Sequence, residues 1–277
     1  MENSVGIIGF GNMGSAIADR IKDKHRTFIF EKDKHKTEGL KGAVVCASIK
    51  ELASLAGVLL IAVKPQDFDH LSKEIRDYSK DKLVISIAAG ISTAHIEKAL
   101  GNVRAVRAMP NIGAKIAESV TCISKGRFAD EHDLDFAKEL FYLMGETMEI
   151  DEKLMNAATA ISGSGPAYIF YFVEADPSLD PRNIPELVRK EFIKRLERAA
   201  LELGFAPLPA AFLSSSTVNT GISLMQKAGL PPSELRQLVS SKGGTTEAAV
   251  KVLQQGGTWD DAAKAALKRA EELFRKE

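Results

Sequence analysis

The first half of the chain alternates short apolar runs, rich in β-branched residues, with amphipathic segments at helical spacing. Strands that are buried on both faces of a parallel sheet have continuous apolar runs of this kind. We expect strands at residues 5–8, 27–30, 44–47, 58–63, 83–87, 103–108 and 120–123. Helices are expected between them at residues 13–21, 49–55, 68–78 and 92–100. This alternation predicts a parallel sheet with right-handed crossover connections.

The second half has a different pattern, because no strand is expected after residue 150. A helix at residues 130–144 that stops at Gly145 and a strand at 147–150 complete the first half. Helices are then expected at residues 168–174, 184–203, 209–227, 232–239, 246–253 and 259–275. With a boundary near Asp151, the pattern predicts an α/β domain at 1–151 and an all-α domain at 152–277.

Composition and charge narrow the class of protein. Of the 277 residues 45% are hydrophobic, and 37 Lys and Arg balance 37 Asp and Glu, so nucleic-acid binding is not expected. Cys46 and Cys122 stand alone in apolar runs and the five histidines lack metal-ligand spacing, so we expect no disulfide framework and no metal. A polar start and apolar runs far shorter than the ~20 residues that span a bilayer predict a cytoplasmic protein with no membrane segment.

A glycine motif follows the first expected strand and opens the first expected helix. It runs Gly9-Phe10-Gly11-Asn12-Met13-Gly14, a G-x-G-x-x-G pattern in a strand–turn–helix context. In this pattern Gly9 makes the tight turn, Gly11 lets the backbone approach a pyrophosphate, and Gly14 lets the helix pack closely on the strand. The free N–H groups at the helix N-terminus favour phosphate. We therefore expect a dinucleotide-binding site of the Rossmann type.

Glu31 stands at the end of the second expected strand, where an acidic side chain accepts a hydrogen bond from a ribose 2′-hydroxyl. Its carboxylate favours NADH by repelling a 2′-phosphate, whereas Lys32 and Lys34 beside it favour NADPH. Both cofactors therefore stay open, and a solvated strand end without a ligand is the alternative. Two further turns end expected strands: at residues 62–65, Pro65 cannot continue the strand, and at residues 88–90, small side chains would let a flat ring approach the backbone.

Two segments of the second domain, residues 161–167 and 240–246, are rich in Ser, Thr and Gly. Such segments present backbone N–H groups and hydroxyls in a concave nest that suits a carboxylate or another small anion. A simpler role for Thr245 or Thr246 is to cap the helix that follows. The two roles do not exclude each other.

Five motifs in this order make the chain resemble pyrroline-5-carboxylate reductase along nearly its whole length. They are the glycine turn at 9–14, Ala62-Val63-Lys64-Pro65-Gln66, Arg107-Ala108-Met109-Pro110-Asn111, Ser162-Gly163-Ser164-Gly165-Pro166-Ala167, and Leu238-Val239-Ser240-Ser241-Lys242-Gly243-Gly244-Thr245-Thr246, the family's signature region. The resemblance implies an oxidoreductase that reduces the cyclic imine of 1-pyrroline-5-carboxylate to L-proline with NADPH or NADH, the last step of proline biosynthesis. It also implies a Rossmann-type parallel sheet followed by an all-α helical dimerisation domain, which forms a homodimer that assembles further into a homodecamer.

The resemblance also assigns roles to matching positions. It implies cofactor binding by Gly9, Gly11, Asn12, Met13, Gly14, Glu31, Ala62, Val63, Lys64, Pro65, Ala88, Ala89 and Gly90, and by Met109, Pro110 and Asn111 at the nicotinamide end. It implies substrate binding by Ser241, Gly243, Gly244, Thr245 and Thr246, in a pocket to which the partner subunit contributes. Thr246 is the expected catalytic residue, whose hydroxyl hydrogen-bonds the imine nitrogen either as a donor or through water. The chemistry is positioning of the imine carbon against the nicotinamide rather than covalent catalysis.

The chain departs from the family pattern at single positions and in one longer segment. Lys242 stands where the family has proline, Ile112-Gly113 follow the Met-Pro-Asn turn in place of Thr-Pro, and Ile49 replaces an asparagine near the adenosine. The twenty residues 176–195 are an apparent insertion, because joining the residues on either side restores a continuous helix.

The apparent insertion leaves alternatives open. A surface loop with a longer helix is the simplest interpretation of residues 176–195, and an altered dimer interface or an engineered graft are the others. For the function, the alternatives are a related imine or β-hydroxyacid reductase, or a non-catalytic nucleotide-binding scaffold if the insertion disrupts the site.

Overall fold

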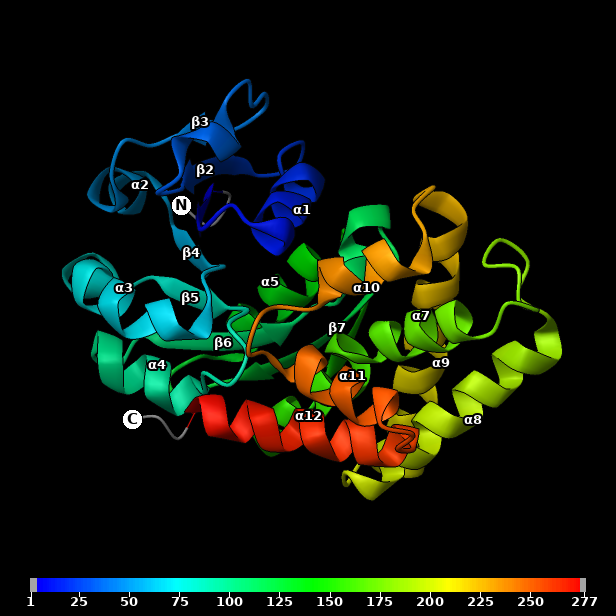
Figure 1. The fold of residues 1–277 in the computed structure, drawn as a ribbon. Helices are drawn as coiled ribbons and strands as arrows, with labels where there is room; N and C mark the ends of the chain where they lie inside the picture. The colour runs from blue at the N-terminus through cyan, green and yellow to red at the C-terminus, as the bar shows by residue number, and fades with distance from the viewer. Residues whose placement is uncertain (1–3, 275–277) are drawn as a thin grey trace. The chain divides into compact units, whose positions relative to one another are not determined.

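The structure is a computed structural model that describes residues 4–274 (Figure 1). Residues 1–3, the polar start considered above, and residues 275–277, where the last expected helix ends, lie outside the described residues. The chain divides into two compact units: unit 1 is Met1–Met109 with Thr121–Glu152, and unit 2 is Pro110–Val120 with Lys153–Glu277. The segment Pro110–Val120 thus groups with unit 2, although the sequence pattern places it in the first domain. The domain ranges 1–151 and 152–277 stay a prediction.

An eight-stranded sheet in the order β3-β2-β1-β4-β5-β6-β7-β8 forms the centre of unit 1. Its strands are β1 Ser4–Ile8, β2 Arg26–Phe30, β3 Val44–Val45, β4 Val58–Ile61, β5 Leu83–Ser86, β6 Arg104–Met109, β7 Ser119–Lys125 and β8 Gly145–Glu149. The five pairings from β3 to β6 are all parallel. Every residue of β4 and β5 is buried, which explains their continuous apolar sequences. The expected Rossmann-type parallel arrangement is confirmed for these strands.

The sheet departs from the expected all-parallel arrangement at its far end. β6 and β7 are antiparallel, with Met109 opposite Cys122. Only the short 3-10 helix η4, Ile112–Ile116, lies between these strands. A parallel connection needs a crossover of about a dozen residues or more, and this link is too short for one. The expectation of a wholly parallel sheet is therefore wrong for this pair.

Five α-helices accompany the strands of unit 1. They are α1 Asn12–Ile21, α2 Ile49–Leu55, α3 Phe68–Ile75, α4 Thr93–Leu100 and α5 Glu131–Tyr142. The α5 helix begins with a capping box in which Asp130 and Asp133 bind each other's backbone N–H. It ends at Tyr142, and Gly145 opens β8 with a φ of +137° instead of stopping the helix. The sequence therefore located this helix correctly but assigned the wrong role to its glycine.

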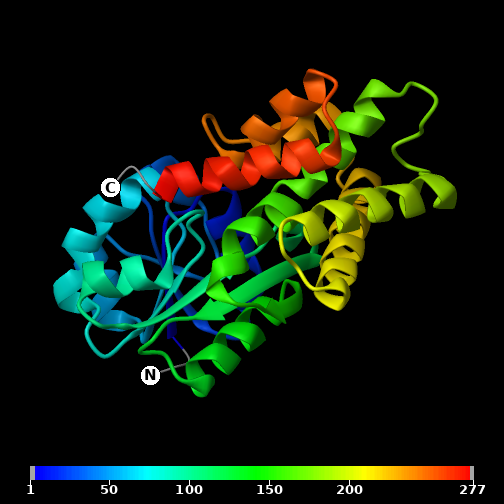
Figure 2. The same ribbon diagram turned by 90° about the horizontal axis from the view of Figure 1, so that it is seen from below.

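Unit 2 is helical apart from the first two residues of β7, as the sequence predicts. Its helices are α6 Met155–Ala158, the π-helix η6 Thr159–Gly163, α7 Gly165–Ala175, α8 Glu186–Glu202, α9 Pro207–Lys227, α10 Pro232–Val239, α11 Thr245–Gln254 and α12 Trp259–Phe274. Figures 1 and 2 both show α11 beside α12 and α8 beside α9. In the described part of the chain, no helix has the length and apolar character needed to cross a bilayer.

The apparent insertion 176–195 forms a loop between α7 and α8 and then the first turns of α8 (Figure 2). Its Phe192 is fully buried and stacks on the Trp259 ring, with ring centroids 5.5 Å apart. Phe172 of α7 meets the Phe192 ring edge-on, with ring centroids 5.2 Å apart. A segment wholly on the surface would not place an aromatic side chain there. The inserted residues therefore contribute to the core of unit 2.

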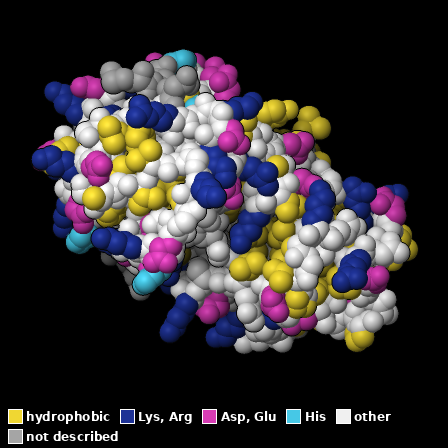
Figure 3. Space-filling model, turned by 90° about the horizontal axis from the view of Figure 1, so that it is seen from above, with side chains coloured by type: hydrophobic (Ala, Val, Ile, Leu, Met, Phe, Trp, Pro, Cys, Tyr) yellow, Lys and Arg dark blue, Asp and Glu magenta, His cyan; other side chains and the backbone are white. Residues whose placement is uncertain are grey.

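Charged side chains of both signs are interspersed over the face shown in Figure 3. This agrees with the equal numbers of acidic and basic residues in the sequence, 37 of each. Acidic and basic side chains are therefore not segregated on the visible face.

Candidate functional site

The register of the sheet brings three of the expected turns to one edge. Ile8 at the end of β1 pairs with Ile61 at the end of β4, which pairs with Ser86 at the end of β5. Because these strands are parallel, the segments that follow them leave the sheet on the same side. Those segments contain the turns at residues 9–14, 62–65 and 88–90. In open α/β sheets, ligands bind outside the carboxyl ends of strands.

The three glycines of the motif differ in why a side chain is absent at their positions. Gly9 has a φ of +101°, and a Cβ there would lie 2.7 Å from the Ala62 carbonyl oxygen. A Cβ on Gly14 would lie 2.2 Å from the Gly9 carbonyl oxygen. A Cβ on Gly11, by contrast, would have no atom within 4 Å. The fold itself thus requires Gly9 and Gly14, whereas the space beside Gly11 is open to a ligand.

The α1 helix begins directly at this turn. Its N-cap residue is Gly11, which provides no side-chain hydrogen bond to the first-turn N–H groups. Ser15 donates its hydroxyl to the Gly11 carbonyl oxygen at 2.8 Å and so points back along the helix. Uncapped N–H groups and the positive end of the helix dipole favour an anion. Together with the open space at Gly11, this N-terminus fits the pyrophosphate of a dinucleotide.

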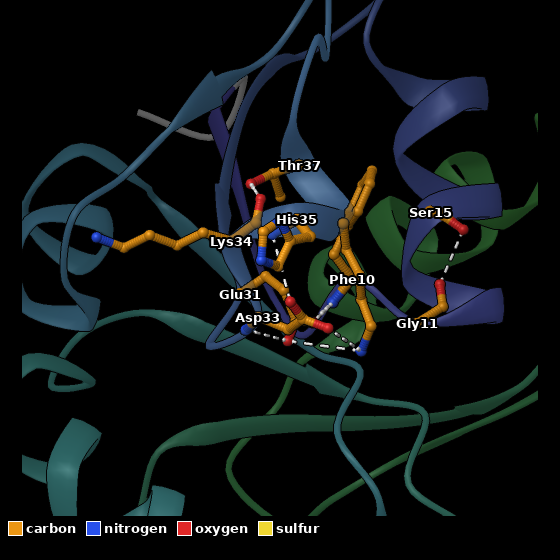
Figure 4. A network of polar contacts seen from close by, with 9 residues as sticks. Phe10, Gly11, Ser15, Glu31, Asp33, Lys34, His35 and Thr37 are labelled. Atoms are coloured by element: carbon orange, nitrogen blue, oxygen red, sulfur yellow. Dashed lines mark hydrogen bonds and ion pairs between the residues drawn. The ribbon is translucent and has the colours of Figure 1, made fainter.

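Glu31 faces the glycine turn from the end of β2 (Figure 4). Its Oε2 accepts a hydrogen bond from the Phe10 backbone N–H at 2.6 Å, and its Oε1 accepts from the Asp33 N–H at 3.0 Å. The Lys36 Nζ lies 3.8 Å from Oε1. The sequence singled out Lys32 and Lys34 beside Glu31 but missed Lys36, whose position in the same basic run was the available signal.

A cavity of about 270 Å³ lies next to Glu31 in unit 1. Six of the expected cofactor residues line it: Gly9, Gly11, Glu31, Ala62, Val63 and Lys64. Ile49, which replaces the asparagine of the family pattern, lines it too, as do Lys36 and Asp67, which the sequence did not single out. Ten expected cofactor residues are not among its lining: Asn12, Met13, Gly14, Pro65, Ala88, Ala89, Gly90, Met109, Pro110 and Asn111. The cavity therefore corresponds to the part of the site around the glycine turn and Glu31.

The expected nicotinamide residues lie where the chain passes from unit 1 to unit 2, between Met109 and Pro110. Asn111 is only 2% exposed, and both ends of its carboxamide have partners. Its Oδ1 accepts from the Gly113 N–H at 3.0 Å, and its Nδ2 donates to the Ser162 hydroxyl at 3.3 Å. The side chain thus fixes the local turn, and a role of Asn111 toward nicotinamide stays a prediction.

The substrate segment 241–246 leads into α11, but its threonines are not helix caps. The N-cap is Gly244, and Gly243 before it has a φ of +69°. A Cβ on Gly244 would lie 2.3 Å from the Ser241 hydroxyl oxygen, so the Ser241 side chain would have to move if this position had a side chain. Thr245 and Thr246 are the first two residues of the helix itself. The capping role considered for them is wrong, and their hydroxyls make other contacts.

Those contacts converge on one residue that the sequence did not assign to the site. Ser164 lies with its Oγ 3.1 Å from the hydroxyl oxygens of both Thr245 and Thr246. Ser164 is fully buried, and the two threonines are 8% and 5% exposed. We call these three residues the hydroxyl cluster. The available signal for Ser164 was its place in a motif rich in small hydroxyl residues.

Two charged side chains hold the turn before α11. The Arg269 Nε of α12 donates to the Gly243 carbonyl oxygen at 2.7 Å. The Glu247 Oε2 accepts from the Gly243 N–H at 2.6 Å. Arg269 brings positive charge to a segment expected to bind a carboxylate. The sequence missed this residue because it lies 26 positions beyond Gly243.

Metal or thiol chemistry has no support in the described residues. Between residues 4 and 274, no three or more His, Cys, Asp or Glu side chains are grouped so that they could hold a metal ion. Cys46 and Cys122 are both buried free thiols. Burial raises the pKa of Cys122 to about 12 and also raises the pKa of Cys46. Neither thiol is activated as a nucleophile.

Family models match parts of both units. Residues 4–90 match the model described as NADP oxidoreductase coenzyme F420-dependent. Residues 152–176 and 190–273 match the model for pyrroline-5-carboxylate reductase dimerisation. The gap between these two matched ranges lies inside the apparent insertion 176–195.

Known relatives match over nearly the full length. The chain is 31% identical over 259 residues to pyrroline-5-carboxylate reductase of Aquifex aeolicus, covering 91% of this chain and 89% of the relative. It is 31% identical over 290 residues to that of Methanosarcina acetivorans, covering 100% of each. The crystal structure of Plasmodium falciparum pyrroline carboxylate reductase with NADP bound has a TM-score of 0.63 and 25% identity, covering 99% of each chain. The chain belongs to the pyrroline-5-carboxylate reductase family.

Proposed function

We propose that this protein reduces the C=N bond of 1-pyrroline-5-carboxylate to give L-proline, with NADH or NADPH as the hydride donor. The observation that carries the proposal is the hydroxyl cluster, which places two threonine hydroxyls at the N-terminus of α11 in the unit that matches the dimerisation model. Family membership along the whole chain supports the same reaction.

The residues of unit 1 fit a nicotinamide dinucleotide. The α1 N-terminus and the open space at Gly11 would bind the pyrophosphate, and Glu31 would accept from a ribose hydroxyl. The cofactor, when bound, supplies the hydride. Ala62, Val63 and Lys64 would form the wall of the adenosine side, because they line the same cavity as Glu31.

The residues of unit 2 fit a small cyclic imino acid. Ser241, Gly243, Gly244 and Thr245 would bind the carboxylate and ring, with the Arg269 charge next to Gly243 favouring the anion. Thr246 would hydrogen-bond the ring nitrogen, which fixes the orientation of the C=N bond. No nucleophile is needed, because hydride transfer to a positioned imine requires orientation above all.

We further propose that the protein forms a homodimer through unit 2, as the match to the dimerisation model supports. Assembly into a decamer and a cytoplasmic location are the finer parts of this proposal. A mass measurement in solution tests the assembly. A monomer would count against the dimer and would indicate that residues 176–195 have altered the interface.

The activity assay uses the purified chain with 1-pyrroline-5-carboxylate and follows loss of reduced nicotinamide absorbance, with NADH and NADPH in parallel. We expect turnover, and we expect Thr246→Val to lower kcat about 100-fold because the ring nitrogen loses its partner. Thr246→Ser is the matched control, which keeps the hydroxyl and most of the activity. A folded protein that binds cofactor but has no turnover would favour the scaffold alternative.

A further inference from the structure

Ser164 occupies a helix N-cap position without acting as a cap. It directly precedes α7, yet its side chain makes no hydrogen bond to that helix's N–H groups. A serine N-cap ordinarily accepts from the N–H of the second or third helical residue, but here the second residue is Pro166, which has no N–H, and the Ser164 backbone is itself helical. Here the hydroxyl is within 3.1 Å of Thr245 and Thr246, which lie 81 and 82 positions further along the chain. The Ser164 hydroxyl therefore bonds residues of another helix and not the helix that it precedes.

The proton count of the cluster explains why a hydroxyl is needed. Ser164 has one proton and two lone pairs, so among the hydroxyl groups of Thr245, Thr246 and Tyr168 it can donate to only one and must accept from the others. The Thr246 hydroxyl is the donor in its contact with Ser164, so toward the ring nitrogen its oxygen acts as an acceptor from the protonated imine. An alanine at 164 would remove this acceptor, and both threonine hydroxyls would lose their shared partner.

The contact matters for the direction of the Thr246 side chain. A helical threonine divides between two χ1 rotamers, because its hydroxyl can also bond a carbonyl of the preceding turn. A hydrogen bond to a fully buried Ser164 favours one of these rotamers. We propose that Ser164 is a positioning residue for catalysis, which holds the Thr246 hydroxyl in the rotamer that meets the substrate's ring nitrogen. This inference rests on the proposed function and adds to it a residue outside the expected site.

The surroundings of Ser164 are rigid enough for this role. Tyr168, one turn further along α7, is fully buried and donates its hydroxyl to the Ala160 carbonyl oxygen of the π-helix at 2.8 Å. Burial raises the pKa of Tyr168, while a hydrogen bond with Ser164 opposes that rise. Tyr168 therefore stays neutral and ties the π-helix to α7 on either side of Ser164.

The test is a double-mutant cycle on the full-length protein with Ser164→Ala and Thr246→Val, measured by kcat and by the KM of each substrate. We expect Ser164→Ala to lower kcat about 10-fold, since misdirecting an orienting group is costly, and to leave the KM for NADH unchanged. In the Thr246→Val background we expect Ser164→Ala to change kcat less than about 2-fold. A merely structural role would give independent, multiplying losses, which would overturn the inference.

Ser214→Ala is the matched control. Ser214 is a fully buried serine of α9 in the same unit, and its hydroxyl has no hydrogen-bond partner. Its removal should leave kcat unchanged. If Ser164→Ala does not fold, Ser164→Cys gives the same information, because a thiol keeps the bulk but accepts weakly; we expect a smaller loss of kcat that also vanishes in the Thr246→Val background. An inactive wild-type protein would refute the proposed function, whereas an active one with multiplying losses would refute only the role of Ser164.

Discussion

The glycine turn of unit 1 and the hydroxyl cluster of unit 2 are built in opposite ways. At the turn, side chains are absent: Gly14 is needed because a Cβ would lie 2.2 Å from the Gly9 carbonyl oxygen. In the cluster, side chains are present, and Ser164 meets residues 81 and 82 positions away. The spacing that forms the first site lies within six consecutive residues, although Gly9 also lies against Ala62, whereas the second site forms only where two helices pack together. A site of the first kind is visible in the sequence, and one of the second kind is visible only in the structure.

The largest expected effect is a difference between substitutions at Gly14, where there is no space for a side chain, and at Gly11, where there is space. Gly14→Ala forces a Cβ against a backbone carbonyl, so we expect the free energy of unfolding to fall by about 3 kcal/mol and cofactor binding to be lost. Gly11→Ala meets no atom within 4 Å and should change stability by less than about 0.5 kcal/mol. It should nevertheless weaken NADH binding, because the methyl group fills the space meant for phosphate. Urea unfolding measures the stability of the two variants, and NADH titration measures their cofactor binding. Equal losses of stability in the two variants would contradict the structural role assigned to Gly14.

The same contrast explains how far the sequence could predict the molecule. The strand–turn–helix order and the glycine spacing are local, and the structure agrees with them. The strand β7 was predicted, but its antiparallel direction was missed because a short 3-10 helix stands where a crossover connection was expected. Ser164 and Arg269 were missed because each acts on a turn that is distant in the chain. The sequence pattern thus predicts interactions within a segment, but not the contacts between segments that are distant in the chain.

Arg269 should affect the substrate site through its hydrogen bond to the Gly243 turn and through its charge. Its Nε donates to the Gly243 carbonyl oxygen at 2.7 Å, so Arg269→Met removes both a hydrogen bond and a charge near the expected carboxylate. We expect the KM for 1-pyrroline-5-carboxylate to rise about 10-fold with kcat nearly unchanged. The control is Glu272→Gln, which changes Arg269's other partner and leaves the Gly243 contact in place. A shift in the KM for NADH instead would place Arg269 at the wrong site.

The glycine turn also has a side-chain contact, because the Glu31 carboxylate accepts from the Phe10 N–H. We expect substitution of Glu31 to have a smaller effect than substitution of Gly14 or Arg269. Its carboxylate lines the cavity together with Lys32 and Lys36. Glu31→Gln removes the charge that repels a 2′-phosphate while both lysines remain, so we expect the ratio of kcat/KM for NADPH to that for NADH to rise about fivefold. Glu38→Gln, which alters a neighbouring exposed carboxylate that does not line the cavity, should leave the ratio unchanged. An unchanged ratio in Glu31→Gln would mean that the lysines do not reach the 2′ position.

The smallest expected effect is a loss of folded-state stability at low pH, at an ion pair outside the two sites. Glu118 pairs with Lys227 of α9, and hydrogen bonds from Lys227 and Ser223 lower the pKa of Glu118 below its usual value of 4.5. A carboxyl group with a lower pKa in the folded state contributes stability above its unfolded pKa and loses that contribution as the pH falls through the folded value. Because the Glu118 and Lys227 side chains are 34% and 54% exposed, so that solvent screens the pair, we expect a loss of about 0.5 kcal/mol below pH 4.5. Glu118→Gln should remove this part of the pH dependence in thermal unfolding at pH 3–7, and an identical slope in both proteins would show that the acid sensitivity arises elsewhere.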